Sequence, residues 1–215
     1  MKILALSDIH GNEYNLRKIL LENKNNIDAI TISGDITNFG NYNDLKNILD
    51  IIDEIRIPYF YILGNCDPKE FKNGIESKGI CVESKCEKID NITILGAGGS
   101  TFTPFNTLFE ISEDELINNL KKAICEEITI LLTHNPPYAS IVDLTKYKIH
   151  VGSKKLREFI LQYSPKIYQC GHIHEARGKE IIGNTLVFNP GPVIRGYYAI
   201  IDLKNLNIEL KSISL

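Results

Sequence analysis

The sequence predicts an α/β fold that contains a largely parallel β-sheet. Three observations support this prediction. Short β-branched runs alternate with helical patterns through the first third of the chain, which is typical of βαβ units. Each of these early strands is followed by a polar turn. The 215 residues, 43% of them hydrophobic, are enough for one sizeable core, so we expect a single domain over residues 1–215.

The N-terminal third contains three expected strands and two expected helices. The strand segments read KILALS, DAITIS and PYFYIL and occupy residues 2–7, 28–33 and 58–63. Between them, residues 14–22 and 42–55 carry apolar side chains at helical spacing. This order of elements favours parallel pairing of the three strands.

The order of elements changes after residue 91. Residues 92–99 (ITILGAGG) predict a strand and a glycine-rich turn, and residues 112–126 predict a helix that begins with the capping-box-like SEDE. A strand at 128–134, a loop rich in Pro and Tyr, a helix at 153–163 and a strand at 166–170 follow. The tail, residues 179–215, consists of short strands and turns, and we expect it to add antiparallel strands.

Composition and charge exclude several function classes. The 24 basic and 27 acidic residues give a net charge of −3, and no long Lys/Arg run is present, which argues against nucleic-acid binding. No apolar run approaches the roughly 20 residues that span a bilayer. The acidic Asp8 comes too early for a signal peptide. We therefore expect a cytoplasmic protein without a membrane partner.

The five cysteines predict thiols that are mostly reduced. They are odd in number, scattered along the chain and without CxxC spacing: Cys66, Cys81, Cys86, Cys125 and Cys170. This pattern argues against both a disulfide framework and a structural zinc site.

Polar side chains gather at the carboxyl ends of the expected strands, where α/β proteins bind their ligands. The turns SDIHGN, SGDITN and LGNCDP follow the first three strands, and later strands end in TH and GHIH. Together they contribute Asp8, His10, Asp35, Asn65, Asp67, His134, His172 and His174. Four of the five histidines in the chain belong to this set. Each motif alone is an ordinary turn or capping signal, so their joint placement carries the argument.

Imidazole and carboxylate groups are the ligands expected for borderline divalent metals such as Mn, Fe, Co, Ni or Zn. All eight residues except Asp67 are candidate ligands. Seven N/O ligands exceed the needs of one ion, so we expect two ions, with Asp35 as the bridging carboxylate. A metal pair lowers the pKa of a bridging water and holds the oxygens of a phosphoryl group. The predicted chemistry is therefore phosphoester hydrolysis by a metal-bridging hydroxide.

The ordered motifs DIH, GD, GNCD, TH and GHIH resemble those of the calcineurin-like metallophosphoesterase superfamily. The resemblance implies a four-layer sandwich, in which two central mixed β-sheets are flanked by helices. It also implies that one metal is held by Asp8, His10, Asp35 and His174, and the other by Asp35, Asn65, His134 and His172. The small size and the segments THNPPY, CGHIHEARG and NPGPV are similar to those of compact phosphodiesterase-like members.

Cys66 departs from this pattern. Many superfamily members have His at this position in a GNH motif, where it is thought to protonate the leaving oxygen or bind phosphate, with an acidic partner that corresponds here to Asp67. A thiol with a pKa of about 8.5 is a poorer acid at neutral pH and has no cationic form. We list Asn65, Cys66 and Asp67 as catalytic candidates and expect weak hydrolysis of esters with alkoxide leaving groups.

The substrate contacts are less determined by the sequence. His150 is either a solvated loop residue or a substrate contact, and Arg177 and Arg195 could bind phosphate or form surface salt bridges. The two histidines of GHIH would point to opposite faces of an extended strand, so the segment must turn or each must serve a different metal. Substrate choice is expected to depend on the loops at 99–110 and 135–152.

The predicted function is a dinuclear phosphohydrolase, with a phosphodiesterase favoured and manganese as the favoured metal. Its expected substrate is a small phosphodiester or nucleotide-like molecule. A phosphomonoesterase or nucleotide pyrophosphatase is the alternative among enzymes. A non-catalytic metal-binding scaffold for protein partners is the second class, and a nuclease is the third. A homo-oligomer is left open.

Overall fold

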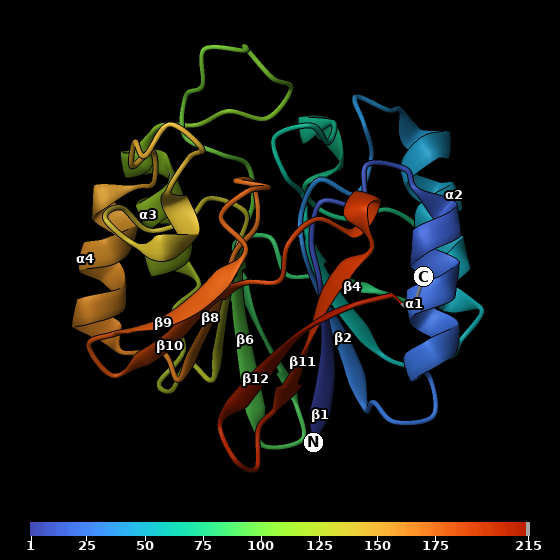
Figure 1. Cartoon of the computed structure of the whole chain (residues 1–215). Helices are drawn as coiled ribbons and strands as arrows, with labels where there is room; N and C mark the ends of the chain where they lie inside the picture. Colours follow the sequence, from blue (N-terminus) through green and yellow to red (C-terminus); the bar gives the residue numbers. More distant parts are fainter. Residues whose placement is uncertain (214–215) are drawn as a thin grey trace.

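The computed structural model describes residues 1–213 as two packed β-sheets with helices on their outer faces. Figure 1 shows helices α1 (Glu13–Asn23) and α2 (Tyr42–Asp53) against one sheet. Helices α3 (Glu113–Lys122) and α4 (Lys154–Tyr163) cover the other sheet. The arrangement is a four-layer sandwich with two mixed six-stranded sheets, which confirms the predicted fold class.

The first sheet has the strand order β12-β11-β1-β2-β3-β4. Its strands are β1 (Lys2–Leu6), β2 (Ala29–Ser33), β3 (Tyr59–Ile62), β4 (Ile80–Cys81), β11 (Tyr197–Asp202) and β12 (Asn207–Ser212). Strands β1 to β4 are parallel, and the hairpin of β11 and β12 adds antiparallel strands beside β1. The N-terminal βαβ prediction is confirmed.

The second sheet has the order β5-β6-β7-β8-β10-β9. Its strands are β5 (Lys85–Ile89), β6 (Ile92–Ala97), β7 (Ile130–Thr133), β8 (Ile167–Gln169), β9 (Gly178–Ile182) and β10 (Thr185–Asn189). Strands β6, β7, β8 and β10 are parallel to their neighbours, while β5 and β9 form antiparallel edges.

The tail differs in part from the prediction. Strands β9, β11 and β12 are antiparallel additions, but β10 pairs with β8 in parallel. The strand order explains this difference. Strand β9 forms the edge of the sheet, and the chain then turns back, so β10 lies between β9 and β8 and runs parallel to β8. The last predicted tail positions, 214–215, lie outside the described residues.

Two short strands were not predicted, and one helix is shorter than expected. Strands β4 and β5 follow one another at the point where the chain passes from the first sheet to the second. Helix α3 ends at Lys122 rather than at residue 126, with Lys121 and Lys122 in its last turn. Cations are favourable there because the unpaired carbonyl groups carry partial negative charge.

Side chains on the two faces of each central strand enter different cores, which explains the continuous apolar runs in the sequence. Ile3 of β1 packs between the sheets with Ile94 and Ile130 of the opposite sheet. Its neighbour Leu4 faces the helical layer and packs in a cluster that includes Leu16 of α1. The sheets are thus buried on both faces, and their ends are left for polar groups.

The cysteine prediction is wrong for one pair. Cys86 of β5 and Cys125, which lies just beyond α3, form a disulfide bond. Cys66, Cys81 and Cys170 are free and buried. The bonded pair is separated by 39 positions and has no local motif, so only the packing of α3 beside the second sheet brings the two sulfurs together. Among residues 1–213, no helix is long and apolar enough to span a bilayer.

Candidate metal centre

All seven predicted ligands come from turns at one end of the two sheets. Asp8 and His10 follow β1, Asp35 follows β2 and Asn65 follows β3 in the first sheet; His134 follows β7, and His172 and His174 follow β8 in the second. The parallel direction of these strands brings their carboxyl ends together. The site therefore lies where the ends of the two sheets meet.

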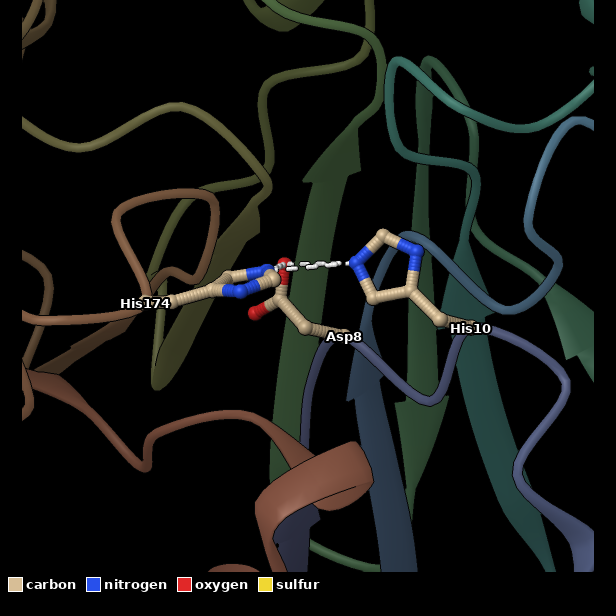
Figure 2. Close-up of side chains that lie close together, drawn as sticks. All are labelled: Asp8, His10 and His174. Atoms are coloured by element: carbon tan, nitrogen blue, oxygen red, sulfur yellow. Dashed lines mark hydrogen bonds and ion pairs between the residues drawn. The ribbon is translucent and has the colours of Figure 1, made fainter.

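Asp8, His10 and His174 form one group of candidate ligands. Figure 2 shows their side chains converging from different segments of the chain. The Nε2 atoms of His10 and His174 are 3.1 Å apart, and Asp8 Oδ1 lies 3.3 Å from His174 Nε2. One potential ligand atom from each of the three residues lies within 4.8 Å of the others.

Asp35, Asn65 and His134 form a second group beside the first. His134 Nε2 is 3.4 Å from Asp35 Oδ2 and 3.0 Å from Asn65 Oδ1. The other ring nitrogen, Nδ1, donates to the Ser33 carbonyl oxygen at 2.7 Å, which leaves Nε2 to face the site. The ring of His172 packs edge-on against that of His134, with centroids 5.0 Å apart.

Asp35 lies between the two groups. The same oxygen, Oδ2, is 3.6 Å from His10 Nε2 and 3.4 Å from His134 Nε2. Its other oxygen, Oδ1, accepts a hydrogen bond of 2.8 Å from the Cys66 backbone N–H. One oxygen of Asp35 thus lies within 3.6 Å of an imidazole of each group, and an oxygen of Asp8 also lies within 4.8 Å of ligand atoms of Asp35 and His134.

The two histidines that pack against each other have opposite electrostatic environments. Burial opposes a charge on His134, but the carboxylate of Asp35 outweighs it and raises the pKa of His134 to about 9. Burial together with the charge of His134 lowers the pKa of His172 to about 4. His172 is therefore neutral at pH 7, while a cation that binds His134 must compete with a proton.

The buried carboxylates remain ionised. Burial alone would raise the pKa of Asp35, but the neighbouring His134 and His10 and the Cys66 N–H hold it below its ordinary value. Asp8 is also buried, and hydrogen bonding with His174 keeps its pKa lowered. Two anionic carboxylates enclosed in this way need a compensating positive charge.

Four of the seven candidate ligands have strained backbones. Asp8, His10, Asp35 and His172 adopt positive φ angles of 52°, 46°, 50° and 70°. Residues other than glycine adopt this left-handed conformation at an energetic cost, which tertiary contacts must offset. At His172 the bend resolves the question raised by GHIH, because His172 packs on His134 while His174 faces His10.

The glycines of these motifs are required by close packing at the site. A Cβ atom on Gly64 would lie 2.8 Å from Asp35 Cγ, and one on Gly171 would lie 2.6 Å from Asp8 Oδ2. Both distances are shorter than a real Cβ contact. The motifs GN and GH thus use glycine so that one turn can approach the carboxylate of another.

Cys66 and Asp67 occupy different positions in this site. Cys66 is buried, and its sulfur could join His10 and Asp35 around one ion. Burial and the charge of Asp35 raise the pKa of the Cys66 thiol. Asp67 is fully buried and accepts hydrogen bonds from the backbone N–H groups of Ile36, Thr37 and Gly64. Asp67 therefore braces the turns that carry Asp35 and Asn65.

A cavity of about 710 Å³ adjoins the centre. His172 and His174 line its floor, and Arg195 is one of its charged residues. Other walls come from the two loops that were predicted to determine substrate choice. They include Phe102, Phe105, Lys146 and Tyr147, none of which was predicted individually from the sequence. The sequence indicated which two loops border the site, but it did not indicate which of their side chains face the cavity.

The other two predicted substrate contacts are engaged elsewhere. Arg177 donates to the carbonyl oxygens of Pro190 and Lys211, and its guanidinium lies 4.6 Å from the centroid of the Tyr197 ring. His150 Nδ1 lies 2.6 Å from an oxygen of Asp143, within the 135–152 loop. These contacts tie both side chains to neighbouring segments, and neither residue is among those that line the cavity. Their contact with a substrate stays a prediction.

The donor set fits divalent metal ions. Its members are carboxylate oxygens, an amide oxygen and imidazole nitrogens, which suit borderline and hard cations. The Nε2 atom of His10 is the ring nitrogen that faces Asp35 and His174. Clustered anionic carboxylates and convergent imidazole nitrogens are the arrangement expected of a metal centre rather than of an ordinary polar core.

Comparison with known proteins agrees with this geometry. The family model for calcineurin-like phosphoesterases matches residues 1–176. The chain is 39% identical to an uncharacterised protein of Methanocaldococcus jannaschii over 96% of this chain and 94% of that protein. It is 26% identical to a probable cyclic nucleotide phosphodiesterase of Ruthia magnifica, over 91% and 87% of the two chains.

A crystal structure of a Thermus thermophilus protein superimposes with a TM-score of 0.77 at 20% identity, and 99% of each chain is covered. This similarity supports the fold. The sequence motifs, the clustered ligands and the matching family model lead to one assignment: the chain belongs to the calcineurin-like phosphoesterase family.

Proposed function

We propose that the protein is a phosphodiesterase that uses two divalent metal ions, with manganese favoured. The observation that carries this proposal is the position of Asp35, whose Oδ2 faces His10 on one side and His134 on the other. A carboxylate shared in this way can offset the repulsion between two neighbouring cations.

Each ion would have its own set of ligands besides the shared Asp35. Asp8, His10 and His174 would hold one ion, and Asn65, His134 and His172 would hold the other. The bound ions would supply Lewis-acid activation of water and of the phosphoryl oxygens.

The protein's own groups would position and stabilise the reacting phosphate. Asn65 is held by His134, and the neutral imidazole of His172 faces the cavity, so both groups are fixed before substrate binds. In hydrolysis, the oxygen of water forms a bond to phosphorus, the bond to the ester oxygen breaks, and that oxygen must gain a proton. Cys66 stands where an imidazole acid would be expected and cannot supply this proton efficiently at neutral pH.

The cavity beside the metal centre has charged groups of both signs. Its walls carry the cationic side chains of Lys146 and Arg195 and the anionic side chain of Glu175. A phosphodiester has one negative charge and a monoester has nearly two at neutral pH. Two bound divalent ions would add four positive charges beside the carboxylates of Asp8 and Asp35, so the choice of a diester rests on the similarity to a probable cyclic nucleotide phosphodiesterase.

The test compares two esters with the same leaving group. Metal-stripped protein is assayed with bis(p-nitrophenyl) phosphate and p-nitrophenyl phosphate, with and without Mn²⁺. We expect Mn²⁺-dependent turnover with a higher kcat/KM for the diester, and loss of this turnover in Asp35→Asn. A higher kcat/KM for the monoester would favour a phosphomonoesterase. Two bound metals without turnover of either ester would favour a scaffold.

A further inference from the structure

Two loops that meet over the cavity present aromatic side chains to solvent. Phe102 and Phe105 come from the loop after β6 and are 74% and 80% exposed. Tyr147 comes from the loop after β7 and is 74% exposed. All three line the cavity whose floor includes His172 and His174. In Figure 1 the first loop, in green, projects well beyond the ends of the sheets.

The loop that carries the phenylalanines is held in place by its own polar groups. Glu110 Oε1 accepts hydrogen bonds from Thr103 Oγ1 at 2.6 Å and from Thr107 Oγ1 at 2.7 Å. At the start of the loop, the Thr101 N–H donates to Asn135 Oδ1 at 3.1 Å. The backbone is therefore anchored on both sides of Phe102 and Phe105, while these two rings stay out of the protein core.

The loop that carries Tyr147 is anchored in a similar way. The buried carboxylate of Asp143 accepts from the Gly152 N–H at 2.9 Å and is paired with His150. The Lys146 N–H donates to Glu175 Oε1 at 3.0 Å, which ties the loop to the segment that follows His174. Tyr147 is thus placed beside the metal centre by a fixed backbone.

Exposed aromatic rings on anchored loops are typical of a binding surface, because burying them against a ligand recovers the free energy lost by keeping them in water. Here the rings share a cavity with the metal centre, so the occupant must carry both a phosphate and an apolar group. Arg195 in the same cavity complements a negatively charged phosphate, while Lys146 Nζ lies 5.1 Å from the centroid of the Tyr147 ring. The cavity volume of about 710 Å³ suits a small molecule rather than a peptide or a membrane surface.

We propose that Phe102, Phe105 and Tyr147 form an aromatic platform that selects phosphodiesters whose non-leaving substituent is a flat aromatic or heterocyclic group. This inference rests on the proposed phosphodiesterase function and names its substrate class. Flat groups gain from stacking and edge-to-face contacts with aromatic rings, which a saturated ring of the same size cannot make.

The test uses diesters that differ only in the shape of the non-leaving group. Benzyl p-nitrophenyl phosphate and cyclohexylmethyl p-nitrophenyl phosphate share a leaving group and are similar in size. We expect the Mn²⁺-loaded protein to have a kcat/KM for the benzyl ester that is higher by roughly 5- to 10-fold, the order of one favourable aromatic pair. Phe102→Ala, Phe105→Ala and Tyr147→Ala should each reduce this preference, while Tyr147→Phe should retain it.

Ile181→Ala serves as the control variant. Ile181 is 72% exposed on the edge strand β9, outside the cavity lining, and its substitution should leave the preference unchanged. Equal kcat/KM values for the two esters, a preference for the cyclohexylmethyl ester, or a preference that survives in all three alanine variants would overturn the proposed platform.

A separate binding experiment distinguishes failure of the proposed phosphodiesterase activity from failure of the proposed aromatic platform. If no ester is hydrolysed, the proposed function fails. Binding of benzyl methyl phosphate and cyclohexylmethyl methyl phosphate is then compared by saturation-transfer NMR. Preferential binding of the benzyl compound that is lost in the alanine variants supports the platform, and equal binding overturns it.

Discussion

The position of the Asp35 carboxylate is set by contacts with residues from several parts of the chain. The carboxylate faces two imidazoles, accepts a backbone hydrogen bond from Cys66, and sits on a residue with a φ of 50°. The two imidazoles are the feature that an ordinary turn does not need, because a positive φ and a backbone hydrogen bond to Asp also occur in structural turns. Together these features hold a buried negative charge where two ligand groups meet.

Cys66 lies beside His10 and Asp35 in the metal centre. Cys66→His should raise turnover of poorly activated diesters, such as those with alkyl leaving groups, because imidazole can protonate the leaving oxygen. A positioned acid contributes on the order of 10²–10⁴-fold. The rate for p-nitrophenyl esters should change much less, since their leaving group needs no proton. Steady-state kinetics with both ester types measures the difference.

Cys66→Ala is the matched variant for this prediction. If the thiol has no part in the chemistry, the alanine variant should keep turnover of p-nitrophenyl esters within a few-fold of wild type. A loss of about 10²-fold or more would show that the sulfur is a metal ligand or an acid, and the reasoning about the missing imidazole would be wrong.

Glu83 is a buried acidic residue outside the metal centre, and its protonation should make the stability of the protein depend on pH. It is buried, and its carboxyl group accepts a hydrogen bond of 2.6 Å from the Gly98 N–H. Burial raises its pKa from the ordinary 4.5 to about 7. Because the folded state holds the proton more tightly, the contribution of Glu83 to stability is fully present below pH 4.5 and is lost as the pH rises from 4.5 through 7.

The size of this effect follows from the shift in pKa and amounts to about 3 kcal/mol. In Glu83→Gln the amide oxygen can still accept from Gly98, but nothing titrates at this position. Denaturant unfolding at several pH values should show the variant gaining stability over wild type between pH 5 and pH 8. A constant difference across this range would mean that Glu83 is not protonated in the folded state.

At the scale of secondary structure, the site is made by strand ends and the turns that follow them. The sequence predicted these turns well, because the apolar run of each central strand stops abruptly at a polar motif such as SDIHGN or SGDITN. It could not predict β4, which has two residues, or the parallel pairing of β10 with β8. Both depend on how distant segments pack rather than on a local pattern.

Gly171 lies where the turn after β8 approaches the turn after β1. Gly171→Ala would place a methyl group against Ser7 and 2.6 Å from Asp8 Oδ2, so the turn after β8 must move away from the turn after β1. Overpacking of this kind costs about 1–3 kcal/mol. We expect weaker Mn²⁺ binding together with a lower free energy of unfolding, measured by calorimetric titration and by denaturant unfolding.

Gly178→Ala is the control for this change. A Cβ on Gly178 would meet the flexible end of Ile141 at 3.0 Å, a contact that a small side-chain shift relieves. Its Mn²⁺ affinity should match wild type. If Gly171→Ala also binds Mn²⁺ like wild type, the close approach of the two turns is not needed to form the site.

At the scale of the whole molecule, two sheets are needed to complete one site. The first sheet supplies Asp8, His10, Asp35 and Asn65, and the second supplies His134, His172 and His174. The candidate ligands and their order could be proposed from the sequence, but the distances between them could not. The disulfide between Cys86 and Cys125 and the engagement of Arg177 by Pro190 and Lys211 were also hidden, since each joins segments without a shared motif.

The proposed chemistry requires one chain to bind two catalytic metal ions around Asp35. The most direct measurement titrates metal-stripped protein with Mn²⁺ and follows hydrolysis of bis(p-nitrophenyl) phosphate, with bound metal measured in the same samples. We predict that the rate saturates at two ions per chain in wild type, and that Asp35→Asn neither binds two ions tightly nor turns over the ester. Full activity at one ion per chain, or without metal, would rule out catalysis by a metal pair.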